Sequence, residues 1–161
     1  MLRTAAILGL DVAPPPAHPF NPLLALRCAA LVDDHHDGHG DHGARKRAID
    51  ALSAAVWRRG PGVTEHDVVA RVLHDAGFDG TALVERASSE PAKARVRANT
   101  DRALADGAFG VPSIVVDGEL FWGFDSFAHL ERRLRGQDPI DGVDFAQWAN
   151  LPAQSVRKAA R

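Results

Sequence analysis

Apolar residues recur at helical spacing through most of the chain, and this spacing changes near residue 110. Between residues 22 and 105 they fall three or four positions apart, in segments bounded by glycine, proline and short polar residues. The spacing predicts a mostly helical chain. Prolines concentrated before residue 22 keep residues 10–22 extended or turning. The expected helices cover residues 1–9, 22–31, 44–60, 64–77, 79–87 and 88–105.

The predicted helix over residues 22–31 carries the only cysteine of the sequence. Asn21 is the expected N-cap, with Pro22 in the first turn. Cys28 is interpreted as a small buried hydrophobe; a reactive thiol is the alternative, with Arg27 as the one basic neighbour. A single cysteine excludes an internal disulfide and a Cys-x-x-Cys redox pair. The side chains expected to be buried in this helix and the next are Leu23, Leu24, Leu26, Ala30, Leu31, Ile49, Leu52, Ala55 and Val56.

After residue 110 the pattern predicts a β-hairpin. Two short apolar runs, residues 113–116 and 119–122, flank Asp117-Gly118, a pair typical of a two-residue hairpin turn. Pro112 opens the first strand, where no ladder donor is required. An amphipathic segment over residues 126–134 predicts a further helix. A helix, a proline-led strand, a turn, a strand and a helix form the C-terminal half of a thioredoxin-like sheet.

This block of sequence resembles a known enzyme family. A long helix runs into Gly-Ala-Phe-Gly-Val-Pro-Ser at residues 107–113, and Val-Asp-Gly-Glu-Leu-Phe-Trp-Gly-Phe-Asp follows at residues 116–125. The run resembles the 2-hydroxychromene-2-carboxylate isomerases, which belong with the kappa-class glutathione transferases to the DsbA-like branch of the thioredoxin superfamily. Weaker similarity reaches back through residues 54–57 and 14–27.

The resemblance implies a fold class and a domain organisation. The fold would be α/β and mostly helical: the C-terminal part of a DsbA-like thioredoxin fold, with an all-helical insertion and a β-hairpin after a cis-proline. Residues 1–136 would form a truncated domain of this type, in which about residues 22–105 are helical and residues 106–136 hold the hairpin and final helix. Residues 137–161 would be a C-terminal tail.

The resemblance also implies a glutathione site around the hairpin. Val111, held by Pro112, would pair through its backbone with the cysteinyl part of glutathione. Phe124, through its backbone, and Asp125 would receive the γ-glutamyl end, because a carboxylate and a helix N-terminus suit an ammonium and a carboxylate. The alternative is that Asp125 merely caps the following helix.

Two tryptophans are candidates for the wall of a substrate pocket. Trp122 alternates with Phe121 along the second strand, so the two side chains are expected on opposite faces. Trp57 and Trp122 would enclose an aromatic substrate, and the alternative is that both are ordinary core residues.

The catalytic serine of the family has no counterpart in this sequence. In the family it ends the first strand, a segment expected upstream of Met1, and hydrogen-bonds the glutathione sulfur to favour the thiolate. Ser113 and Ser126 do not match its position. We therefore expect a displaced start or a truncated copy, and a hairpin with an open edge.

Composition and charge narrow the classes of partner. The chain has 161 residues, 45% hydrophobic and 25% charged, with a net charge of −2. This balance gives no electrostatic reason to expect nucleic acid or an anionic membrane, and no apolar run approaches the ~20 residues that span a bilayer. With one cysteine and no recognisable signal peptide, the expected location is the cytoplasm.

A histidine-rich segment at residues 33–43 is the one candidate metal site. His35, His36, His39 and His42 alternate with aspartates and could chelate zinc or nickel. Three glycines in the same segment prevent a preorganised site, so a solvated loop without a physiological metal is the interpretation.

The resemblance implies a glutathione-dependent isomerase of the 2-hydroxychromene-2-carboxylate type, or a kappa-like glutathione transferase, acting on a small aromatic substrate. In the isomerase reaction a thiolate adds reversibly to a conjugated enone, the former double bond rotates, and elimination releases the isomer. Without the serine, we expect impaired activity. The alternatives are a non-catalytic glutathione-binding remnant and a relative of disulfide oxidoreductases without redox cysteines. The open sheet edge would also allow a homodimer.

Overall fold

A computed structural model describes residues 2–32, 43–140, 142–144 and 151. The chain divides into two compact units, Met1–Ala103 and Leu104–Arg161, here called the helical unit and the hairpin unit. The predicted fold class is confirmed: the chain is mostly helical and holds a small sheet after a cis-proline. No helix in the described ranges is long and apolar enough to cross a membrane.

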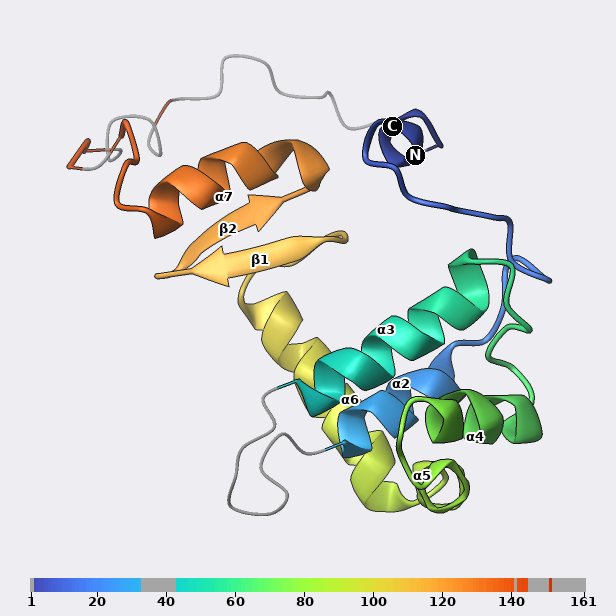
Figure 1. Cartoon of the computed structure of the whole chain (residues 1–161). Coiled ribbons are helices and arrows are strands. Elements are labelled where there is room, and N and C mark those ends of the chain that lie inside the picture. Colours follow the sequence, from blue (N-terminus) through green and yellow to red (C-terminus); the bar gives the residue numbers. More distant parts are fainter. Residues whose placement is uncertain (1, 33–42, 141, 145–150, 152–161) are drawn as a thin grey trace, which may run out of the picture. The chain divides into compact units, whose positions relative to one another are not determined.

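The helical unit contains the helices that the apolar spacing predicts (Figure 1). Their bounds are α1 Leu2–Ile7, α2 Leu23–Leu31, α3 Ala44–Trp57, α4 His66–Asp75, α5 Gly80–Ala87 and α6 Glu90–Ala105, which reaches the boundary with the hairpin unit. Helix α3 ends three residues before the expected stop at Gly60, because Arg59 adopts a left-handed conformation (φ 57°). A side chain at Gly60 would collide with the backbone of Ala55, 2.5 Å from the ideal Cβ.

Capping side chains set the starts of three helices. The carboxylate of Asp79, the first residue of the predicted helix over residues 79–87, accepts a hydrogen bond from the amide of Ala82 (3.0 Å) and caps α5. At α2 the N-cap position is held by Pro22, one residue after the predicted Asn21, whose side chain accepts a hydrogen bond from the amide of Leu23 (3.0 Å). Ser89 accepts one from the amide of Ala92 (3.4 Å) at the start of α6. Helix α4 differs, since the residue at its N-cap is Glu65 and makes no side-chain capping bond.

The core of the helical unit is built from α2, α3, α4 and α5. Cys28, Val69 and Leu73 are its largest fully buried side chains, so the prediction for Cys28 is confirmed. Helices α4 and α5 approach so closely that a Cβ at Gly80 would lie 1.9 Å from the carbonyl oxygen of Ala70.

The buried faces of α2 and α3 were predicted incorrectly at several positions. Leu23, Leu26 and Ile49 are 41%, 48% and 47% exposed. Helix α2 instead buries Ala25 and Cys28, small side chains that allow close packing against the other helices. Leu24 and Leu31 lie partly buried at the edge of this core, and Leu52, Ala55 and Val56 of α3 are buried as predicted.

The hairpin unit follows the sequence prediction closely. Strand β1 (Ser113–Val116) pairs antiparallel with β2 (Glu119–Trp122), with Ser113 opposite Trp122 and Val116 opposite Glu119. The turn residues Asp117 and Gly118 both have positive φ, 51° and 82°, as a type I′ turn requires. A 3₁₀ turn, η1 (Phe124–Ser126), then leads into α7 (Phe127–Leu134) (Figure 1).

The two faces of β2 differ in exposure. Phe121 is only 7% exposed, whereas Trp122 is 47% exposed. Helix α7 contacts β2, and the ion pair between Arg133 of α7 and Asp117 (3.5 Å) links the helix to the hairpin turn. The predicted alternation of Phe121 and Trp122 is therefore confirmed, and Trp122 lies on the more open face.

Candidate functional site

The peptide bond between Val111 and Pro112 is cis, as the family resemblance implies. The Val111 side chain is 93% exposed. Within the described part of the hairpin unit, its backbone N–H and C=O form no hydrogen bond. Val111 therefore presents both backbone groups for pairing with an extended ligand.

One hydrogen bond brings the two halves of the predicted site together. The amide of Gly123 donates to the carbonyl oxygen of Pro112 (3.0 Å). This bond extends the hairpin ladder by one pair, so Val111, which precedes Pro112, lies near Phe124, which follows Gly123. The four predicted cofactor-binding residues thus belong to one unit and lie within or just beyond the pair that Pro112 forms with Gly123.

The Asp125 carboxylate is exposed and is not occupied by an interaction with the described residues. It makes no hydrogen bond or ion pair with the residues described, so the structure contains no capping bond from Asp125. One of its oxygens lies 2.5 Å from the position that a Cβ would occupy at Gly123, whose φ is 84°. Glycine at this position leaves room for the carboxylate beside the Pro112 end of the hairpin.

An aromatic contact that the sequence prediction missed supports the segment before Val111. The rings of Phe109 and Trp122 lie 4.9 Å apart between centroids. A Cβ at Gly110 would lie 2.4 Å from Nε1 of Trp122, so the indole packs directly on the Gly110 backbone. This contact depends on the hairpin register and on side-chain packing, which the sequence pattern alone does not contain.

Trp57 lies in the helical unit, whereas Trp122 lies in the hairpin unit. Trp57 lines an apolar cavity of about 270 Å³ together with Phe20, Leu26 and Ile49. Leu26 and Ile49 are partly exposed because their side chains border this cavity and do not fill it. The pocket shared by the two tryptophans stays a prediction.

Neither the cysteine of the helical unit nor two serine hydroxyls of the hairpin unit are available as nucleophiles. Burial raises the pKa of Cys28 to about 11, so this cysteine is a poor nucleophile at neutral pH. The hydroxyl of Ser113 donates to the carbonyl oxygen of Gly110 (2.7 Å). The hydroxyl of Ser126 donates to the backbone carbonyl oxygen of Trp122 (2.5 Å).

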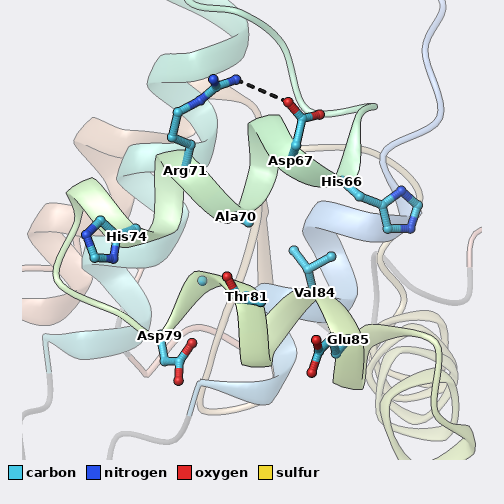
Figure 2. A pocket seen from close by; sticks show the side chains of 10 residues that line it. His66, Asp67, Ala70, Arg71, His74, Asp79, Thr81, Val84 and Glu85 are labelled. Atoms are coloured by element: carbon cyan, nitrogen blue, oxygen red, sulfur yellow. Dashed lines mark hydrogen bonds and ion pairs between the residues drawn. The ribbon is translucent and has the colours of Figure 1, made fainter.

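A second hollow, of about 520 Å³, lies between α4 and α5. His66 and His74 stand at opposite ends of its α4 side, and Asp79 and Glu85 lie on the α5 side (Figure 2). Its floor is apolar, and it contains none of the predicted site residues. The polar side chains at its rim, His66 and His74 among them, are exposed.

Metal ligands are not gathered at any described position. The parts of the chain with described coordinates hold no group of three or more histidine, cysteine or acidic side chains that suits a metal ion. His35, His36, His39 and His42 lie outside the described residues, so the metal alternative is not tested.

A family model for the DSBA-like thioredoxin domain matches residues 1–135. The chain belongs to the DSBA-like thioredoxin family. The 2-hydroxychromene-2-carboxylate isomerase of Pseudomonas sp. (strain C18) is 30% identical over 94 residues, 58% of this chain and 44% of the relative. The isomerase of the same name from Sphingobium xenophagum is 30% identical over 107 residues, 66% of this chain and 52% of the relative.

A solved structure of a 2-hydroxychromene-2-carboxylate isomerase has a similar fold, with a TM-score of 0.66 and 23% identity. The alignment covers 84% of this chain and 62% of that one. The chain therefore spans about half the length of the curated relatives that it matches. The similarity establishes a DsbA-like thioredoxin fold and relatives named as isomerases.

Proposed function

We propose that this chain binds glutathione at Val111 and Asp125 and acts in a glutathione-dependent isomerisation of the 2-hydroxychromene-2-carboxylate type. The observation that supports the proposal is the hydrogen bond from the Gly123 amide to the Pro112 carbonyl oxygen, because Val111 precedes Pro112 and Asp125 follows Gly123 by two residues. The curated relatives named as isomerases support the reaction class.

The residues present fit glutathione in three respects. The free N–H and C=O of Val111 match the backbone of an extended tripeptide, which pairs as a strand does. The Asp125 carboxylate matches the γ-glutamyl ammonium, and the backbone of Phe124 at the start of η1 lies beside it. The side chain of Val111 is exposed, so an entering peptide meets no obstruction from it.

The chain's residues would orient the ligand and receive the substrate. When bound, glutathione would supply the thiol that adds to, and leaves, a conjugated double bond. Pairing at Val111 fixes the cysteinyl backbone, and with it the direction in which the sulfur can reach. In the same unit, the exposed indole of Trp122 would offer an aromatic surface to a small aromatic substrate.

A binding module without turnover is the second candidate. The engaged hydroxyls of Ser113 and Ser126 favour it, because neither is available to hydrogen-bond a glutathione sulfur. On this account the chain holds glutathione but does not shift the sulfur toward the thiolate.

One experiment separates the candidates. Glutathione binding by the 161-residue chain would be measured by calorimetry, and conversion of 2-hydroxychromene-2-carboxylate would be followed by absorbance with and without glutathione. Binding with a glutathione-dependent rate supports the isomerase. Binding without a rate supports the module, and an absence of binding overturns both.

A further inference from the structure

Gly123 joins strand β2 to the turn η1, and hydrogen bonds hold the backbone on both sides of it. Its amide donates to the carbonyl oxygen of Pro112 (3.0 Å), and its own carbonyl oxygen accepts from the amide of Ser126 (3.3 Å). The Ser126 hydroxyl also donates to the carbonyl oxygen of Trp122 (2.5 Å). All of these bonds lie within the hairpin unit, so the conformation of this joint is fixed inside that unit.

The conformation at Gly123 is one that only glycine adopts readily. Its φ of 84° and ψ of 161° fall in a region that is closed to residues with a Cβ. A Cβ built on Gly123 would lie 2.5 Å from Oδ1 and 3.7 Å from Cγ of Asp125. The carboxylate of Asp125 therefore occupies the space that any other side chain at residue 123 would need.

A side chain at residue 123 would displace this carboxylate. Cβ atoms essentially never come within 3.0 Å of another heavy atom, so one of the two groups would have to move. The Asp125 oxygen is the end of a rotatable side chain, whereas the Gly123 backbone is held by its bonds to Pro112 and Ser126. The carboxylate is the group that yields, because rotation to another rotamer breaks no bond within the described residues. The absence of a side chain at residue 123 thus determines the direction of the carboxylate.

We propose that Gly123 is a specificity-determining residue, which lets the Asp125 carboxylate select thiol peptides that carry a free γ-glutamyl ammonium. The inference rests on the proposed glutathione function, and it adds a residue that acts through Asp125. A charge-assisted hydrogen bond is strong only where donor and acceptor meet at about 2.7–2.9 Å in good alignment. A carboxylate that is already confined to one direction also loses little rotamer freedom on binding.

The affinities of two ligands test this selection. Reduced glutathione is compared with glutaryl-cysteinylglycine, the analogue that lacks the γ-glutamyl amino group. The native chain should bind glutathione about 10-fold more tightly than the analogue. Gly123→Ala should reduce this preference to about threefold or less, through weaker binding of glutathione. Its affinity for the analogue should stay within about threefold of native, which shows that the Val111 platform remains intact.

Gly118→Ala is the matched control. Gly118 belongs to the same unit and also has a positive φ (82°), but no described atom lies within 4 Å of its Cβ position. Alanine there experiences the strain of a positive φ without a collision, so the preference for glutathione should be retained. In an Asp125→Asn background, Gly123→Ala should change the glutathione affinity by less than about twofold, because the group through which it acts is already altered.

A measurement without ligand separates this inference from the proposed function. The Hα–Hβ couplings of Asp125 report its side-chain rotamer by NMR, and they should change in Gly123→Ala but not in Gly118→Ala. If the native chain does not bind glutathione, the proposed function fails and the selection fails with it. If it binds, then an unchanged Asp125 rotamer, a preference that survives Gly123→Ala, or an undiminished effect in the Asp125→Asn background would overturn this inference alone.

Discussion

Substituting Gly110 by alanine should reveal the contact that supports the segment before Val111. A Cβ at this position would lie 2.4 Å from Nε1, 3.2 Å from Cε2 and 3.4 Å from Cδ1 of Trp122. Ordinary contacts of this kind are about 3.4–4 Å, so the indole or the backbone must move by about 1 Å. The movement disturbs the packing of Trp122 on Phe109, whose ring centroid lies 4.9 Å away.

The expected cost is about 1–2 kcal/mol for the hairpin unit, from overpacking and loss of an aromatic contact worth about 0.5–1.5 kcal/mol. The sign should reverse in a Trp122→Ala background. Gly110 does not have a positive φ, so alanine is tolerated there once the indole is gone. A compatible Gly→Ala change stabilises by about 0.4–1 kcal/mol through the unfolded state.

Native-state hydrogen exchange of the Ile114 and Val116 amides, which face β2, provides the assay. Gly110→Ala should speed their exchange by about 5- to 30-fold in the native background and slow it by about 2- to 5-fold in Trp122→Ala. An equal effect in both backgrounds would refute the reasoning, because the collision with Trp122 would then not be the cause.

Two further predictions concern the helical unit. Burial raises the pKa of Cys28 from 9.0 to about 11, so the stability that the neutral thiol contributes is complete below pH 9 and is lost as the pH rises through about 11. Relative to Cys28→Ala, the native chain should therefore lose about 2 kcal/mol of unfolding free energy between pH 8 and pH 11 in urea titrations, and parallel curves for the two chains would contradict this. Asp79→Ala should lower the unfolding free energy by about 1 kcal/mol in the same assay, because the capping bond from the Ala82 amide is lost. The control Asp75→Ala, at the exposed end of α4, should be nearly neutral, and equal losses of stability in the two variants would argue against the cap.

Local chemistry made the hairpin predictable. Asp117-Gly118 sets the turn whatever surrounds it, and the short apolar runs on either side fix the register. The starts of α5 and α6 were predictable for the same reason, since Asp79 and Ser89 act on amides three residues away. These features depend on neighbours in sequence, so a single sequence contains them.

The buried face of α2 was not predictable in this way. Helical spacing identifies apolar positions, but it does not say which of them another helix covers. Leu23 and Leu26 are more hydrophobic than Ala25 and Cys28, yet the smaller side chains are buried because they allow closer packing.

The candidate site was foreseen in part. Val111, Pro112, Phe124 and Asp125 were named from a resemblance, and hairpin geometry explains why they lie together. The packing of Trp122 on Gly110 and Phe109 was missed, because it depends on how side chains meet across the end of the ladder. A second cis bond, between His18 and Pro19, was also missed, since several neighbouring X-Pro bonds look alike in sequence.

The measurement that tests the central claim most directly is a titration of the isotope-labelled chain with reduced glutathione, followed by NMR. The account predicts saturable shifts at the amides of Val111, Phe124 and Asp125, and an affinity that falls at least about tenfold in Asp125→Asn. Asp106→Asn, an exposed carboxylate of the same unit, is the matched control and should bind like the native chain. Shifts confined to other residues, or equal binding by the two variants, would contradict the account.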